Sequence, residues 1–300
     1  MREYTIYQVD AFTTEKFKGN PAGVVIAADG LSGREMQMLA RELNNSETVF
    51  LLSPDGPDHE VRLRYFTPTV EVPICGHATI AAHYVRSLKN NFKPGRVMQK
   101  LSIGILPVDI ESSSDDYTIW MTQGTIEFSS PLKDKDRQDL LAALTLNEQD
   151  LHPRCPIQIV STGHSKVMVG IRSRQKLNLI TPDENSLITL SKVIGCNGYF
   201  VFTFADSPSD VLTHGRMFAP AIGIYEDPVT GNANGPLGAY LVKHGLVSHN
   251  NSLFSFTGAQ GEAIGRDGKV MVKVAIENDQ PTQVQVGGNA VIVFETKIQL

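Results

Sequence analysis

The pattern of hydrophobic and polar residues predicts alternating strands and helices. Apolar and polar residues alternate over residues 4–12, as in a half-buried strand. Residues 32–44 carry apolar side chains at helical spacing, and Ser32 begins a capping-box pattern, so we expect an amphipathic helix there. The apolar residues 48–52 predict a buried strand. Glu47 then lies in the short loop between helix and strand.

One long motif occurs twice. Residues 66–85 (FTPTVEVPICGHATIAAHYV) and 218–241 (FAPAIGIYEDPVTGNANGPLGAYL) both run from an aromatic residue and a proline through an extended stretch to a glycine, and then become helical. Such repetition indicates a duplicated fold. Gly76 and Gly231 stand where the helices begin, and the free backbone N–H groups of a helix N-terminus attract anions. Two facing copies would form one cradle for a carboxylate.

The elements before the second motif repeat those before the first. Strands at residues 156–160 and 166–171, an amphipathic helix around Leu187 and a buried strand at residues 199–204 follow the order found in residues 4–52. The sequence therefore predicts two domains of similar construction.

Length and composition agree with two globular domains. The chain has 300 residues, of which 41% are hydrophobic and 20% charged. We place the domains at residues 1–128 and 129–286, with the polar stretch 129–137 as linker. Residues 290–295 predict a last strand, and the segment of about residues 287–300 that contains it is a candidate to return to the first domain.

Charge and cysteine usage narrow the class of partner. The net charge of -5, without a run of Lys and Arg, argues against nucleic acid or an anionic membrane surface and favours a small molecule. No apolar run approaches 20 residues and the first residues contain no apolar signal region, so we expect a cytoplasmic protein. The scattered Cys75, Cys155 and Cys196 fit neither a disulfide framework nor a clustered zinc site. We predict no cofactor and no metal.

The two halves differ in one carboxylate. Setting residues 191–202 against residues 40–51 without gaps places Gly198 opposite Glu47. Inverting a carbon centre normally needs one base on each face, whereas one carboxylate can remove a proton and return it at another carbon on the same face. The asymmetry therefore favours isomerisation, with Glu47 as the base.

The repeated motif contains further candidates. Asp227 lies in three extra residues of the second copy, where it is either functional or a turn aspartate. His77 either donates a hydrogen bond to a substrate oxygen or caps its helix. Cys75, His77 and His83 suggest a metal only superficially, because Cys75 and His77 are not at a standard ligand spacing.

Several spaced motifs resemble the PhzF family of phenazine biosynthesis-like isomerases. They are GNPAGVV at residues 19–25, NSET around Glu47, FTPTVEVPICGHAT and EDPVTGNANGP, and the resemblance covers essentially the whole chain. It implies an α+β, diaminopimelate epimerase-like fold: two pseudo-symmetric α/β domains, each with a mixed sheet around a central helix, and an active site in the interdomain cleft. It also implies a homodimer.

The resemblance implies roles for individual residues. Glu47 is then the general acid/base, and His77 and Asp227 assist it. The family has a serine where this chain has Asn232, and this departure favours a small acid other than the phenazine precursor, a dihydro-hydroxyanthranilate. We predict substrate binding by Asn20, Gly76, Gly231 and Asn232.

The predicted activity is that of a cofactor-independent isomerase acting on a small carboxylate-bearing carbon acid. Two alternatives remain open. Racemases of the same fold use two cysteines, one per half; Cys75 stands where one would be expected, but residues 226–231 contain no second. The other alternative is a protein that binds a metabolite without chemistry.

Overall fold

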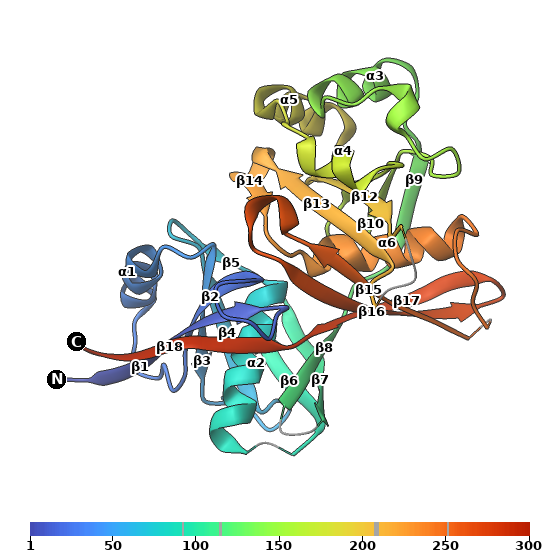
Figure 1. Cartoon of the computed structure of the whole chain (residues 1–300). Helices are drawn as coiled ribbons and strands as arrows, with labels where there is room; N and C mark the ends of the chain where they lie inside the picture. The colour runs from blue at the N-terminus through green and yellow to red at the C-terminus, as the bar shows by residue number, and fades with distance from the viewer. Residues whose placement is uncertain (92, 114–115, 207–209, 251) are drawn as a thin grey trace. The chain divides into compact units, whose positions relative to one another are not determined.

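The computed structural model describes residues 1–91, 93–113, 116–206, 210–250 and 252–300, which fall into two units (Figure 1). Unit 1 consists of Met1–Met121 and Gly287–Leu300, and unit 2 of Thr122–Val286. The end of the chain thus belongs to unit 1. There β18 (Ala290–Gln299) pairs antiparallel with β1 (Glu3–Ala11), as Figure 1 shows.

Unit 1 is built on one mixed sheet. Its further strands are β2 (Asn20–Val25), β3 (Glu47–Leu52), β4 (Val61–Phe66), β5 (Glu71–Val72), β6 (Gly95–Leu101), β7 (Gly104–Ser113) and β8 (Asp116–Thr122). The strands pair in the order β18-β1-β2-β3-β4-β6-β7-β8, with β5 beside β4. Among these pairs, β2 with β3 and β4 with β6 are parallel. Parallel neighbours need a crossover connection, and a helix supplies each one.

The two helices of unit 1 cover opposite faces of its sheet. Tyr65 of β4 bonds Thr79 of α2 (Gly76–Asn90), while the next residue, Phe66, belongs to the apolar cluster beneath α1 (Gly33–Leu43). Successive strand residues point to opposite faces. Helix α2 is buried from His77 through Val85, as expected of a central helix around which the sheet curves.

Unit 2 repeats this arrangement. Its strands are β9 (Glu127–Pro131), β10 (Gln158–Ser161), β11 (Lys166–Gly170), β12 (Tyr199–Phe204), β13 (Thr213–Ala219), β14 (Ile224–Asp227), β15 (Leu253–Gln260), β16 (Gly268–Glu277) and β17 (Gln280–Gly288). The pairing order β9-β10-β11-β12-β13-β15-β16 matches that of β18 through β7. The parallel pairs again begin at the third and fifth strands of the pairing order, β11 with β12 and β13 with β15.

Helices cover both faces of the second sheet as well. The buried α6 (Gly231–Lys243) packs against β10, β11, β15 and β16. A separate apolar cluster lies under α3 (Asp134–Ala143), α4 (Arg174–Leu179) and α5 (Glu184–Ile194). The short 3-10 helices η1 (Glu148–Asp150), η2 (Pro220–Ile222) and η3 (Glu262–Ile264) complete the unit.

The structure corrects two local expectations. Gly19, Asn20 and Pro21 are turn-forming residues and predict a turn, but Asn20 and Pro21 form the start of β2, paired with β1. The predicted linker at residues 129–137 is wrong, because β9 pairs with β10 and α3 begins at Asp134. The polar residues 112–116 predict a hairpin turn, but residues 114–115 lie outside the described residues.

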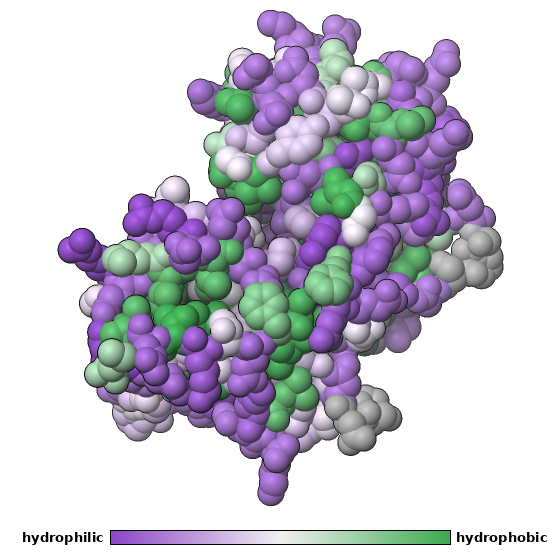
Figure 2. Space-filling view, turned by 60° about the vertical axis from the view of Figure 1, so that its left-hand side comes forward, coloured by the Kyte–Doolittle hydropathy of each residue, from purple (hydrophilic) through white to green (hydrophobic). Residues whose placement is uncertain are grey.

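The visible surface is mainly polar. On the face drawn in Figure 2, hydrophilic residues predominate and hydrophobic ones form separate groups between them. Within the described part of the chain, no helix is long and apolar enough to cross a membrane.

Candidate functional site

Glu47 begins β3 directly after the loop that ends α1. The helix closes at Asn44, a left-handed residue (φ 53°) whose backbone N–H donates to the Ala40 carbonyl. The chain then enters β3, where Glu47 lies opposite Ala22 of the parallel strand β2. The Glu47 side chain is 16% exposed. One end of the sheet therefore presents a carboxylate that is mostly withdrawn from water.

His77 lies against Glu47. It is the second residue of α2, and its Nε2 is 3.3 Å from Oε2 of Glu47 and 3.3 Å from Oγ of Ser46. The imidazole is buried. An imidazole nitrogen at this distance can exchange a proton or a hydrogen bond with the carboxylate. The fold therefore brings together two of the three predicted catalytic residues.

Cys75 completes a cluster with these two residues. It is the N-cap residue of α2, and its Sγ lies 3.5 Å from Nδ1 of His77. Glu47, Cys75 and His77 offer ligand atoms within 4.8 Å of one another, a set that could hold a zinc ion. The third residue of the metal-ligand set considered from the sequence was His83. The structure has Glu47 in that place, and the buried His83 bonds Gln99 at 2.9 Å.

Two predicted binding positions also lie in unit 1. Asn20 is buried at the start of β2, opposite Ala11 of β1. Gly76 is the first residue of α2, and a Cβ added there would meet no atom within 4 Å. Open space therefore adjoins the free N–H groups at this helix N-terminus, as an anionic ligand would need.

In unit 2, Asp227 ends β14 and is bonded to the residue that caps the start of α6. The hydroxyl of Thr230, the N-cap residue, donates to Oδ2 of Asp227. The side-chain amide of Gln260 donates to the Asp227 carbonyl at 2.7 Å, and its Oε1 accepts from the Thr230 N–H at 3.1 Å. These bonds hold the half-buried aspartate in one place.

Gly231 and Asn232 share one partner, Gln123. Its amide nitrogen donates to Oδ1 of Asn232 at 2.9 Å and to the Gly231 carbonyl at 3.3 Å. Its amide oxygen accepts from the hydroxyl of Thr162 at 2.8 Å. Asn232 thus accepts through its oxygen, and its amide nitrogen keeps its capacity to donate.

The two units differ at equivalent positions. Gly198 directly precedes β12, as Glu47 begins β3, and a Cβ at Gly198 would lie 2.9 Å from the Phe218 carbonyl oxygen. Unit 2 has no room for an acidic side chain there. The N-cap residue is Cys75 in α2 and Thr230 in α6, so the thiol of unit 1 also has no counterpart.

Sequence reasoning missed Lys166, the first residue of β11. It is only 3% exposed. Burial lowers its pKa to about 8, while the nearby Asp227 and Cys196 act in the opposite direction. The available signal was a lysine at the head of a strand that is otherwise apolar, KVMVG. Its burial depends on packing between segments far apart in the chain.

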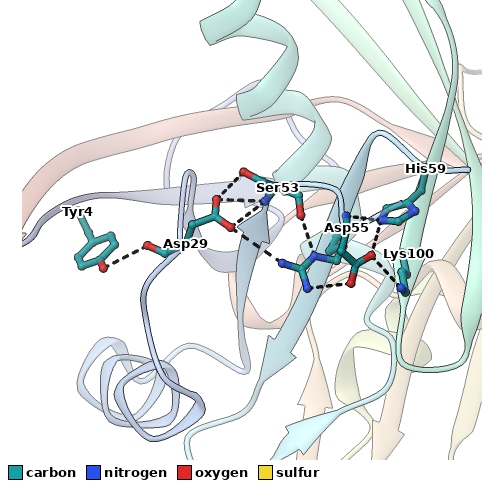
Figure 3. Close-up of polar contacts among 7 residues, drawn as sticks. Tyr4, Asp29, Ser53, Asp55, His59 and Lys100 are labelled. Atoms are coloured by element: carbon teal, nitrogen blue, oxygen red, sulfur yellow. Dashed lines mark hydrogen bonds and ion pairs between the residues drawn. The ribbon is translucent and has the colours of Figure 1, made fainter. Parts of the chain in front are cut away.

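A second polar cluster in unit 1 serves the fold instead (Figure 3). Asp29 accepts from the hydroxyl of Ser53 at 2.7 Å, and Arg62 donates to the Ser53 carbonyl at 2.7 Å and to Asp55 at 3.1 Å. Lys100 donates to the other oxygen of Asp55 at 2.8 Å and thereby lowers its pKa. The partners lie on connecting loops and neighbouring strands, which they fasten together.

Comparison with known proteins gives a family for this chain. Residues 9–296 match the family profile described as "Phenazine biosynthesis-like protein" (PhzC-PhzF). Uncharacterized isomerases of Clostridium acetobutylicum and Escherichia coli, the latter YddE, are 56% and 50% identical, covering 100% and 97% of this chain and 99% and 97% of their own. The trans-2,3-dihydro-3-hydroxyanthranilate isomerase of Pseudomonas aeruginosa is 30% identical over 100% of both chains.

Solved structures confirm the predicted fold. A PhzF-family phenazine biosynthesis protein of Bacillus anthracis has a TM-score of 0.89 at 30% identity, over 100% of both chains. A hydroxyproline epimerase of Agrobacterium vitis has a TM-score of 0.63 at 11% identity, over 99% of this chain and 91% of its own, and shows the fold alone. The α+β epimerase-like fold expected from the sequence is therefore correct.

Proposed function

Because the chain belongs to the phenazine biosynthesis-like (PhzC-PhzF) family, we propose that it is a cofactor-independent isomerase that moves a proton on a small carboxylate-bearing carbon acid. The observation that carries the proposal is the contact between Oε2 of Glu47 and Nε2 of His77, at 3.3 Å in a largely buried setting. The homologues named as isomerases support the reaction class.

Glu47 takes both proton-transfer roles. Its carboxylate removes a proton from a carbon next to a C=C bond, and the C–H electron pair forms a new double bond to the adjacent carbon. The π pair of the former double bond moves to the far carbon, which takes the proton back from the carboxylic acid. His77 donates a hydrogen bond to the carboxylate or to a substrate oxygen. The N–H groups that begin at Gly76 stabilise the negative charge that develops on that oxygen.

Asp227 and Asn232 belong to the proposal as residues that orient the substrate. Each is fixed by hydrogen bonds to unit 2, Asp227 through Thr230 and Asn232 through Gln123. The N–H groups at a helix N-terminus and the Asn232 amide can donate to an anionic group, whereas the Asp227 carboxylate can accept a hydrogen bond from another part of the substrate. Their part in the reaction stays a prediction.

The substrate class is a small unsaturated or amino carboxylic acid. The relative from P. aeruginosa is named for trans-2,3-dihydro-3-hydroxyanthranilate. Asn232 replaces the serine that the family resemblance leads us to expect, and its amide is larger and already bonded to Gln123. We therefore propose a different acid of similar size.

A racemase that uses Cys75 is the second candidate. In its favour, the thiol lies 3.5 Å from the His77 ring, which can act as its base. Against it, unit 2 has Thr230 at the equivalent cap position. Two-thiol chemistry would need a second cysteine there.

The test is proton NMR in D₂O on a panel of unsaturated and amino carboxylic acids, each incubated with wild type, Glu47→Gln or Cys75→Ser. We expect deuterium incorporation or a double-bond shift that only Glu47→Gln abolishes. Loss in Cys75→Ser alone would support the racemase. Binding without exchange by the wild type would support a metabolite-binding protein.

A metal arm accompanies this test. Glu47, Cys75 and His77 could hold zinc, so the wild type is assayed before and after dialysis against EDTA. The proposal predicts an unchanged exchange rate. Loss of exchange that added zinc restores would replace the cofactor-independent mechanism by a metal-assisted one.

A further inference from the structure

Lys166 presents a buried ammonium group to the face of the sheet that α6 covers. Val167 and Val169 of the same strand belong to the apolar cluster on the opposite face. Since strand residues alternate, the Lys166 side chain lies on the α6 side, and α6 packs against β11. A lysine that is 3% exposed is rare in a protein interior and requires a physical explanation.

The ammonium has few partners. Within the described part of the chain, its one hydrogen bond runs to the Ser165 carbonyl, at 3.4 Å. An ammonium carries three donors, and burying them without acceptors is costly. Burial lowers the pKa of Lys166 to about 8, with Asp227 and Cys196 opposing, so the group is still mainly charged at neutral pH. A bound ligand with a hydrogen-bond acceptor could supply the partner that the Lys166 ammonium lacks.

Two chains of contacts connect Lys166 with the N-terminus of α6. Asp227, whose charge acts on Lys166, is bonded to the N-cap residue Thr230. The loop just before Lys166 begins at Thr162, which Gln123 joins to Asn232. The 13-residue helix has free N–H groups and a partial positive charge at this end. Ammonium and helix end therefore add their attraction for the same kind of ligand.

We propose that Lys166 binds the carboxylate of the substrate, together with the first N–H groups of α6. The inference rests on the proposed function, because the bound anion is the carboxylate of the isomerised acid. Lys166 touches the substrate but transfers no proton.

The first test observes Lys166 itself in the intact protein. Lysine side chains are labelled with ¹⁵N, and the Lys166 ammonium signal is followed by NMR during titration with matched acid and amide pairs: anthranilate with anthranilamide, and L-proline with prolinamide. A bound anion favours the charged form, so we expect at least one acid to raise the pKa of Lys166 by about one unit. The amides should leave it unchanged, and exposed Lys192 on α5 is the internal control.

The result that overturns the inference is equally direct. If no acid of the panel moves the Lys166 signal, or if acid and amide move it alike, Lys166 is not a carboxylate-binding group. Lys166→Met should weaken binding of the responsive acid by about tenfold or more, the typical loss of a charged hydrogen bond. Lys192→Met should bind it as the wild type does.

Failure of this inference can be separated from failure of the proposed function. Glu47→Gln removes the proposed base but should keep the acid-dependent shift at Lys166. A shift without any proton exchange in the wild type would uphold the binding site and reject the isomerase. Proton exchange in the wild type without a shift of the Lys166 signal would uphold the isomerase and reject the carboxylate-binding role of Lys166.

Discussion

At the scale of single residues, the difference between Glu47 and Gly198 limits the chemistry of the fold. Both stand where equivalent strands of the two units begin, β3 and β12, but a side chain at Gly198 would collide with the Phe218 carbonyl. A second acid therefore cannot be gained at this position by a simple substitution. The proposed one-carboxylate proton transfer is therefore supported by backbone packing at Gly198 as well as by residue identity.

His83 makes the stability of the protein depend on pH. It is fully buried, and burial lowers its pKa to about 4. Between pH 4 and 6.5 the unfolded chain binds more protons at this residue than the folded one, so stability rises with pH. We expect the wild type to lose about 2 kcal/mol more free energy of unfolding than His83→Gln when the pH falls from 6.5 to 4.5.

Urea unfolding of both proteins at the two pH values measures this difference. Glutamine keeps a donor for Gln99, the partner of His83 at 2.9 Å, so the variant should still fold. Equal losses in the two proteins would show that the pKa of His83 is the same in the folded and in the unfolded protein.

At the scale of elements, the capping box of α1 is a local source of stability. The backbone and hydroxyl of Ser32 bond the Glu35 carboxylate, and the Ser32 oxygen accepts from the Glu35 N–H. Replacing such a cap by alanine costs about 1 kcal/mol. Ser32→Ala should therefore lower the free energy of unfolding by about 1 kcal/mol in urea denaturation.

The exposed Ser112 on β7 provides the matched control for this substitution. Ser112→Ala should leave the unfolding free energy unchanged within about 0.5 kcal/mol. A Ser32→Ala protein as stable as this control would show that the cap contributes nothing.

Helices and strands whose ends are set by local residues, such as helix caps, could be predicted from the sequence. The helix expected at residues 32–44 is Gly33–Leu43 with caps at Ser32 and Asn44, because capping chemistry is local. The linker at residues 129–137 was mispredicted, because the pairing of β9 with β10 is not visible in a polar segment that ends in proline.

The residues of the candidate site also differ in whether the sequence could identify them. Sequence reasoning pointed to Glu47 and His77 separately, and the fold places them 3.3 Å apart. It missed Lys166, because the burial of that side chain arises from α6 and the sheet of unit 2, which assemble from distant segments. Long-range packing of this kind leaves no local pattern.

At the scale of the whole molecule, the C-terminal strand β18 stabilises the N-terminal strand β1. β18 pairs with β1 along the whole of that strand. A protein truncated after Asn289 would leave β1 with an unpaired edge and open the core beneath α2. We expect limited proteolysis to cleave unit 1 of the truncated protein rapidly and to spare unit 2. Deletion of Leu300 alone is the control, and equal protection of unit 1 in both proteins would contradict the prediction.

The homodimer implied by the family resemblance remains a prediction about the whole molecule. Light scattering after gel filtration should give a mass of twice 32.9 kDa, independent of protein concentration. A mass of 32.9 kDa throughout would show a monomer.

The proposed role of Glu47 as the base is tested most directly by the rate of proton exchange into the acid found in the NMR panel, compared between wild type and Glu47→Gln. Glutamine keeps the size of the side chain but cannot accept the proton. The proposed mechanism predicts a fall of roughly 10² to 10⁴-fold, the usual contribution of general acid/base catalysis, with Cys75→Ser close to wild type. A Glu47→Gln protein that exchanges at the wild-type rate would contradict it.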